Sequence, residues 1–278
     1  MSVFVFGSVV LAAFLHAAWN ALIKGARSKA NGALTLVLVQ GVMGALIAST
    51  QPWPAGEVWL WLLGSGLFHT FYILFLGRAY EQGDLSRVYP IARGAAPMIV
   101  TLISAAVLLD RIAPFEYFGI FVLGLGVAIM AQGAFRNNES RRLVPLAFGS
   151  ALMTAGYSLV DGLGARAAGD PTQYVAWLFV LNALFYLPIS LWMGGRAVLP
   201  RSRGEWGRGT AAAAASYGAY AIAVWAMTEA PIALVAALRE SSILFAVLIG
   251  WLLFRDRMDA PKALAAGMIV FGMVLTRI

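Results

Sequence analysis

Ten apolar segments, each close to the length that spans a bilayer, dominate this sequence. They cover approximately residues 3–23, 33–50, 58–78, 85–108, 115–134, 144–164, 174–193, 210–228, 231–254 and 260–276. A transmembrane helix needs about 20 predominantly apolar residues, and only helices or closed barrels satisfy their backbone groups in hydrocarbon. The runs are continuous rather than alternating, which is typical of helices and not of barrel strands. The sequence therefore predicts an all-α integral membrane protein with ten transmembrane helices.

The composition and the short connections leave no room for a soluble domain. Of 278 residues, 61% are apolar and 12% are charged, whereas soluble domains have roughly 45–50% apolar and about 25% charged residues. The sequence contains no phosphate-loop string of the type G-x-x-x-x-G-K-[ST], so we expect neither ATP-driven transport by this chain alone nor a bound cofactor. Cysteine is absent, which excludes disulfides. The first segment has no basic flank and is read as a helix rather than a signal peptide.

The positions of the 20 lysines and arginines predict the orientation of the chain. Fifteen lie in or beside the connections that follow the odd-numbered segments, and three (Arg111, Arg166 and Arg277) lie on the other side. The positive-inside rule then places the odd connections in the cytoplasm and both termini outside, in a cell (inner) membrane. We assign the net charge of +7 to contacts with anionic lipid headgroups, and we expect no binding of nucleic acid.

A polar connector near the middle of the chain divides it into two halves. The halves are residues 1–136 and 144–278, and the connector is 137–143. Residues that recur between the halves at an offset of 146 are Asp110 and Asp256, Arg93 and Arg239, and Gly126 and Gly272. Five crossings is an odd number, so a repeated second half enters the membrane from the opposite side. We expect two inverted five-helix repeats.

Charged residues inside spanning segments are rare here and are candidates for function, because a charge in hydrocarbon is costly. Arg93 and Arg239 are the two basic residues outside the connections, and Glu240 follows Arg239 directly. A guanidinium holds a carboxylate or phosphate in a bidentate fork. We therefore expect Arg93 and Arg239 to bind the anionic group of a substrate. The alternative is a structural ion pair of one arginine with Glu240.

Proton coupling has three candidate residues: Glu240, His69 and Asp161. Both histidines of the chain, His16 and His69, fall inside apolar segments. A histidine there can relay a proton, contact substrate or make a packing hydrogen bond. Asp161 lies near a predicted segment end, so its alternative role is a solvated boundary residue. Since no H-x-x-x-H or H-E-x-x-H spacing occurs, we expect no metal site.

Further candidates for substrate binding are polar and aromatic side chains within the segments. His16, Trp19 and Asn20 are spaced i, i+3 and i+4 and share one helical face. The remaining candidates are Tyr72, Tyr89, Tyr157 and Trp225. Packing, or the aromatic belt at the membrane interface, is their alternative role. Prolines at 90 and 97 flank Arg93, and proline permits a bend where polar groups gather.

Five strings spread along the chain carry a resemblance to a known family. They are HAAWNALIK at 16–24, GDLSRVYPIARGAAP at 83–97, LLDRI at 108–112, ALRESS at 237–242 and LFRDRM at 253–258. With ten segments in two halves, the whole chain resembles the EamA-type permeases of the drug/metabolite transporter superfamily. The family typically has glutamate where Asp110 and Asp256 stand.

This resemblance implies a helical carrier of small organic solutes, often an exporter coupled to the proton gradient. It also implies a cavity lined by segments 1, 3, 4, 6, 8 and 9. Many members are assigned cytoplasmic termini, which is opposite to the charge count above.

Together these features predict a secondary transporter that exports a small polar, anionic or zwitterionic metabolite by alternating access. Its expected partners are the small-molecule substrate, membrane lipids and protons, and both a monomer and a homodimer remain open. The runner-up is a lipid or headgroup flippase, followed by a non-transporting membrane scaffold. A membrane-embedded enzyme is not expected.

Overall fold

The computed structural model describes the backbone of residues 1–24, 29–82, 85–107, 110–132, 143–200, 202–254 and 260–277. Side chains are described in these ranges except at 24, 29–30, 80–82, 85–94, 130–132 and 253–254. Over the described residues the chain is helical and contains no strand. The helices are α1 (Val3–Lys24), α2 (Lys29–Ala48), α3 (Val58–Gln82), α4 (Leu85–Val107), α5 (Pro114–Gln132), α6 (Leu143–Ala168), α7 (Pro171–Gly194), the short 3₁₀ turn η1 (Gly195–Val198), α8 (Arg203–Glu229), α9 (Ile232–Arg239), α10 (Ser242–Phe254) and α11 (Ala260–Leu275).

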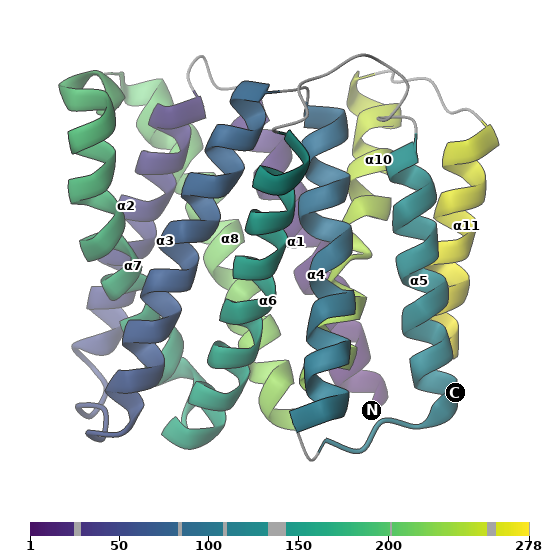
Figure 1. Cartoon of the computed structure of the whole chain (residues 1–278). Coiled ribbons are helices and arrows are strands. Elements are labelled where there is room, and N and C mark those ends of the chain that lie inside the picture. Colours follow the sequence, from purple (N-terminus) through teal and green to yellow (C-terminus); the bar gives the residue numbers. More distant parts are fainter. Residues whose placement is uncertain are drawn as a thin grey trace.

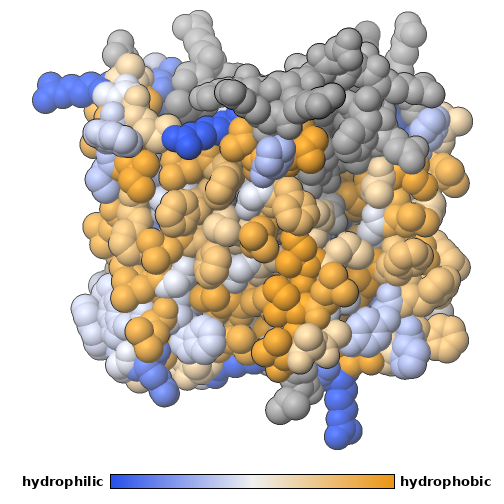
Figure 2. Space-filling model, viewed as in Figure 1, coloured by the Kyte–Doolittle hydropathy of each residue, from blue (hydrophilic) through white to orange (hydrophobic). Residues whose placement is uncertain are grey.

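Six helical spans among the described residues are long and apolar enough to cross a membrane. They are Val3–Ile23, Asn31–Ala48, Val58–Ala79, Leu143–Ala168, Pro171–Val198 and Ile232–Leu252. Shorter apolar helices run over Ala95–Val107, Pro114–Ile129 and Ala260–Leu275. Large apolar side chains are exposed on the outside of the bundle, and Figure 2 shows them as a broad band with polar groups at both ends. This is the surface of a multi-pass membrane protein.

The helices stand side by side in one bundle, and both termini lie at the same end (Figure 1). The two halves of the chain are interleaved rather than separate. The main packing pairs join one half to the other: α1 with α8, α2 with α7, α3 with α6, α4 with α6, and α5 with α11. The interior of the bundle is therefore an interface between the halves.

The ninth predicted segment, 231–254, is two helices rather than one. Helix α9 ends at Arg239 and α10 begins at Ser242, although together they form one span of 21 residues. The chain between them turns with i→i−3 bonds, from Glu240 N to Ala237 O at 3.0 Å and from Ile243 N to Glu240 O at 3.0 Å. Such a 3₁₀ stretch inside a helix often marks a functional hinge.

Two glycines bring α5 and α11 into backbone contact. A Cβ added at Gly119 would lie 2.9 Å from Gly272 O, and a Cβ added at Gly272 would lie 2.7 Å from Leu123 N. Small residues let membrane helices approach closely where no hydrophobic force drives their association. This pair therefore ties the last helix of one half to the last helix of the other.

A tight turn joins α6 to α7. Gly169 has a φ of 71°, in the left-handed region that glycine occupies without strain. The Asp170 carboxylate then accepts hydrogen bonds from Thr172 N at 2.8 Å and Gln173 N at 3.3 Å, which caps α7. The turn fixes the two helices that carry Asp161 and Tyr174.

Candidate functional site

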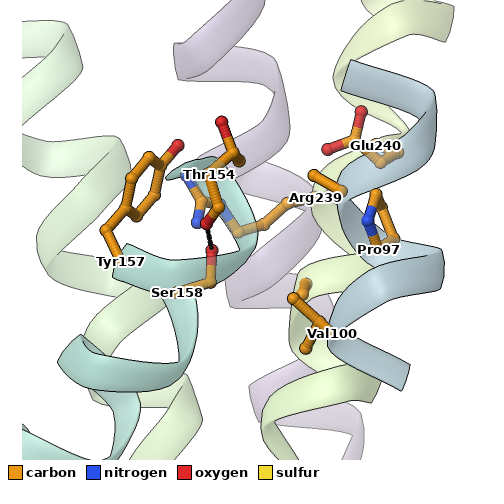
Figure 3. Close-up of a pocket in the computed structure, with 9 residues that line it drawn as sticks. Pro97, Val100, Thr154, Tyr157, Ser158, Arg239 and Glu240 are labelled. Carbon is orange, nitrogen blue, oxygen red and sulfur yellow. Dashed lines mark hydrogen bonds between the residues drawn. The ribbon is translucent and has the colours of Figure 1, made fainter. Parts of the chain in front are cut away.

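A cavity lies where α4, α6 and the α9–α10 break meet. Its lining is Ala96, Pro97 and Val100 from α4, Thr154, Tyr157 and Ser158 from α6, and Ala236, Arg239 and Glu240 from α9 and the break. Its volume is about 10 Å³, which is room for about one water molecule. Figure 3 shows the Arg239 side chain extending from α9 toward the α6 residues. The cavity thus lies between the two halves of the chain.

Among the described lining residues, Arg239 is the basic one, and we name this cavity the Arg239 pocket. Only 9% of Arg239 is exposed, and its guanidinium carbon lies 5.1 Å from the centre of the Tyr220 ring. A cation within about 6 Å of an aromatic ring face is stabilised by the ring. Glu240 is also buried. The pocket therefore combines a fixed cation, a carboxyl group and the hydroxyl groups of Thr154 and Ser158.

A second polar cluster surrounds Asp161, one turn of α6 beyond the pocket. The Asp161 carboxylate is fully buried, with His69 Nε2 3.2 Å from its Oδ2 and the Tyr174 hydroxyl donating to its Oδ1 at 3.1 Å. The Tyr220 hydroxyl donates to Oδ2. Buried charges are normally paired and hydrogen-bonded, and three partners satisfy this one. The alternative role of Asp161 as a solvated boundary residue is wrong, because α6 continues seven residues past it to Ala168.

His69 and Asp161 come from different halves of the chain. His69 lies on α3, and its ring stacks on Tyr157 of α6 with centroids 4.1 Å apart and planes at 13°. Tyr157 also lines the Arg239 pocket. We call His69 and Asp161 the Asp161–His69 pair.

The predicted group of His16, Trp19 and Asn20 forms a local arrangement on α1. Trp19 Nε1 donates to His16 Nδ1 at 3.3 Å, and Asn20 Nδ2 donates to His16 O at 2.7 Å. All three side chains are half-buried. The structure places them on one helix face, as expected, but not in the lining of the Arg239 pocket.

The remaining predicted aromatic residues divide into three groups. Tyr72 contacts Tyr157 edge to face, with centroids 5.7 Å apart, and so lies next to the pocket wall. Trp225 contacts Phe4 edge to face and lies outside the pocket lining. The side chains of Tyr89 and Arg93 lie outside the described residues, so their predicted role remains a prediction.

A third polar cluster, at the end of the bundle where the termini lie, joins the halves through an ion pair. Arg166 Nη1 and Nη2 donate to the two Asp110 carboxylate oxygens at 2.8 and 3.1 Å. Arg166 also donates to Met227 O at 2.8 Å and Ala230 O at 3.0 Å. Ile232 N donates to Asp110 Oδ2 at 3.1 Å. This Asp110–Arg166 clamp fixes the start of α5 and the start of α9 to the end of α6.

Several residues of these clusters were not predicted from the sequence. Tyr174 and Tyr220 complete the shell of Asp161, and Arg166 completes the clamp. The recurrence of Asp110 at Asp256 was the one sequence signal for the clamp. No spacing rule pairs Asp161 with Tyr220, 59 residues away, because only the packing of α6 on α8 brings them together.

A bundle of apolar helices with buried charges between two halves defines a multi-pass membrane protein of the transporter type. The family model described as the EamA-like transporter family matches residues 4–132 and 142–278. The chain belongs to this family, within the drug/metabolite transporter superfamily, whose members are transporters and not enzymes.

Solved structures share the fold of this chain. Of 29 matching chains, one crystal structure aligns with a TM-score of 0.77 over 99% of this chain and 96% of the other. Its sequence identity is 19%, so the likeness concerns the fold alone. No curated protein matches the chain significantly.

Proposed function

We propose that this protein is a secondary transporter that exports a small polar metabolite, anionic or zwitterionic, by alternating access. The observation that carries the proposal is Arg239, a buried cation in a cavity between the two halves of the bundle. A charge is retained at such a position mainly where it has a function.

The chemistry of the Arg239 pocket favours a small acid as substrate. A guanidinium binds carboxylate or phosphate groups through two parallel hydrogen bonds. Glu240 lines the same cavity and supplies a carboxyl group for the ammonium of a zwitterion.

Alternating access is supported by the way the halves interlock. The ten spanning segments are numbered along the chain, with α9 and α10 together as the ninth and α11 as the tenth. Each segment of the first half then corresponds to the segment five places later. Under this correspondence the packing of α3 on α6 matches the packing of α8 on α1. The packed pairs α2–α7 and α5–α11 each consist of two corresponding segments, so the exchange leaves these pairs unchanged. This two-fold exchange supports the inverted repeat with ten crossings that we propose for this chain. Broken helices at the repeat interface are a common site of substrate binding in such transporters.

We propose further that the chain lies in the cell (inner) membrane with both termini outside, as the charge count favours. The proton is carried by the Asp161–His69 pair, with Glu240 as a second carboxyl group in reach of the pocket. The pair suits this role because a histidine changes charge near neutral pH. It is also buried beside Tyr157, which the pocket shares.

A thermal-shift screen of the purified protein tests the substrate class. Amino acids, small organic acids and phosphorylated metabolites are added separately to wild type and to Arg239→Ala. A ligand at 100 times its Kd stabilises the folded state by about 2.7 kcal/mol, which is measurable as a rise in Tm. We expect a hit among the acids that Arg239→Ala abolishes. Hits restricted to lipids, or acid hits that Arg239→Ala leaves unchanged, would overturn the proposal.

A further inference from the structure

We propose that Tyr220 couples the Arg239 pocket to the Asp161–His69 pair, so that an anion bound at Arg239 and a proton bound at the pair stabilise each other. The inference rests on the proposed transport function. It names Tyr220 as the residue that joins the two sites, and it states that binding at one site strengthens binding at the other.

Tyr220 contacts both sites through two different parts of one side chain. Its hydroxyl donates to the Asp161 carboxylate, and its ring lies 5.1 Å from the Arg239 guanidinium carbon. Tyr174 donates to the same carboxylate but makes no contact with Arg239 among the interactions described for the chain. Tyr220 is thus placed to transmit a change at Arg239, whereas Tyr174 is not.

Charged and titratable groups face the pair from α6 itself and from each helix that packs on α6 and has described side chains near the pair. They are His69 from α3, Tyr157 from α6 itself, Tyr174 from α7, Tyr220 from α8, and Arg239 with Glu240 from α9 and the break. Arg93 of α4 lies outside the described side chains. The Arg239 guanidinium stays protonated under all relevant conditions, so it is the fixed positive charge of this set.

The sign of the coupling follows from that fixed charge. While the pocket is empty, Arg239 opposes the addition of a second positive charge at the pair, because like charges repel most strongly where water is excluded. An anion on the guanidinium cancels this repulsion. The proton affinity of the pair then rises when the anion binds. Linkage requires that the affinity for the anion rise by the same factor when the pair is protonated.

The transport step is therefore a co-transport of anion and proton. The pair takes one proton from the solution on one side of the membrane, forming one N–H or O–H bond. The same bond breaks when the proton is released on the other side. A monovalent anion crosses with this proton as an electroneutral pair, so the step is driven by the solute gradient together with the pH gradient and not by the membrane potential.

Histidine NMR tests this coupling without knowledge of the substrate. The chain has two histidines, so His16 on α1 serves as an internal control for His69. Arg239→Gln removes the positive charge, as a bound anion would neutralise it. We expect the proton affinity of the pair, read from the His69 ring in labelled protein in nanodiscs, to rise by at least about fivefold, the lower end of typical coupling. Arg239→Lys keeps the charge and should behave like wild type.

A double-mutant cycle then tests the role of Tyr220. In the Tyr220→Phe background, which keeps the ring and removes the hydroxyl, Arg239→Gln should change the titration of His69 less than it does in wild type, because only the direct charge–charge repulsion remains. In the matched Tyr174→Phe background, which also removes one hydrogen bond to Asp161, the effect of Arg239→Gln should persist.

Two results overturn the inference. One is an unchanged His69 titration in Arg239→Gln, in a variant that elutes as wild type and has its helical content. The other is an equal effect of Arg239→Gln in the Tyr220→Phe and wild-type backgrounds, which would mean that Tyr220 is not the link. Loss of the thermal-shift hits would instead refute the proposed function and leave this titration result standing.

Discussion

Breaking the Asp110–Arg166 clamp should lower the free energy of unfolding by about 2 kcal/mol. The Arg166 guanidinium donates four hydrogen bonds, two to Asp110 and two to the backbone oxygens of Met227, near the end of α8, and Ala230, just after it. Exposed ion pairs contribute about 0.2–1 kcal/mol, and breaking a fully buried pair costs about 3–5 kcal/mol. The two side chains are 31% and 16% exposed. The expected cost of Arg166→Ala therefore lies between these limits.

Equilibrium unfolding in mixed detergent micelles, followed by circular dichroism, measures this cost. Arg196→Ala is the matched control, because Arg196 lies exposed on η1, and surface substitutions change stability by less than about 0.5 kcal/mol. Asp110→Asn and the double variant complete a cycle, whose coupling should exceed about 0.5 kcal/mol. An Arg166→Ala variant as stable as Arg196→Ala, or additive single effects, would refute the clamp as a stabilising link between the halves.

Three further predictions concern other positions. Gly272→Ala should destabilise the fold by about 1–3 kcal/mol, since its Cβ would meet the Leu123 backbone at 2.7 Å. Gly267→Ala on the same helix has no neighbour within 4 Å and should not destabilise it; equal unfolding curves for the two would contradict the α5–α11 contact. Asp170→Ala should cost about 1 kcal/mol through the lost cap of α7, measured in the same way. Asp161→Asn should make solute efflux from proteoliposomes independent of pH, and an unchanged pH profile would exclude the pair as the proton carrier.

The helical membrane fold was predictable because hydrocarbon permits few alternatives. Continuous apolar runs leave the helix as the state that satisfies the backbone, and the six long spans fall within or around predicted segments. The break after Arg239 was not predictable, because residues 232–249 contain neither proline nor glycine.

The sequence predicted the charged and titratable residues of the candidate site, but not the side chains that contact them. Arg239, Glu240, His69 and Asp161 were identified because charged or titratable side chains are costly inside apolar segments. Tyr220 was missed, because tyrosine carries no such cost and is common in membrane helices for other reasons. Its importance depends on the packing of α8 against α6, which a pattern along one helix does not contain.

Efflux from proteoliposomes tests the central claim, transport of a small polar solute through the Arg239 pocket, most directly. Vesicles hold wild type, Arg239→Ala or Arg196→Ala at equal protein content and are loaded with the acid identified in the thermal-shift screen. The account predicts efflux for wild type and Arg196→Ala, and at least about a tenfold loss for Arg239→Ala, because truncating the buried partner of a bound charge costs about 2–5 kcal/mol. Equal efflux from the Arg239→Ala and wild-type vesicles would contradict it.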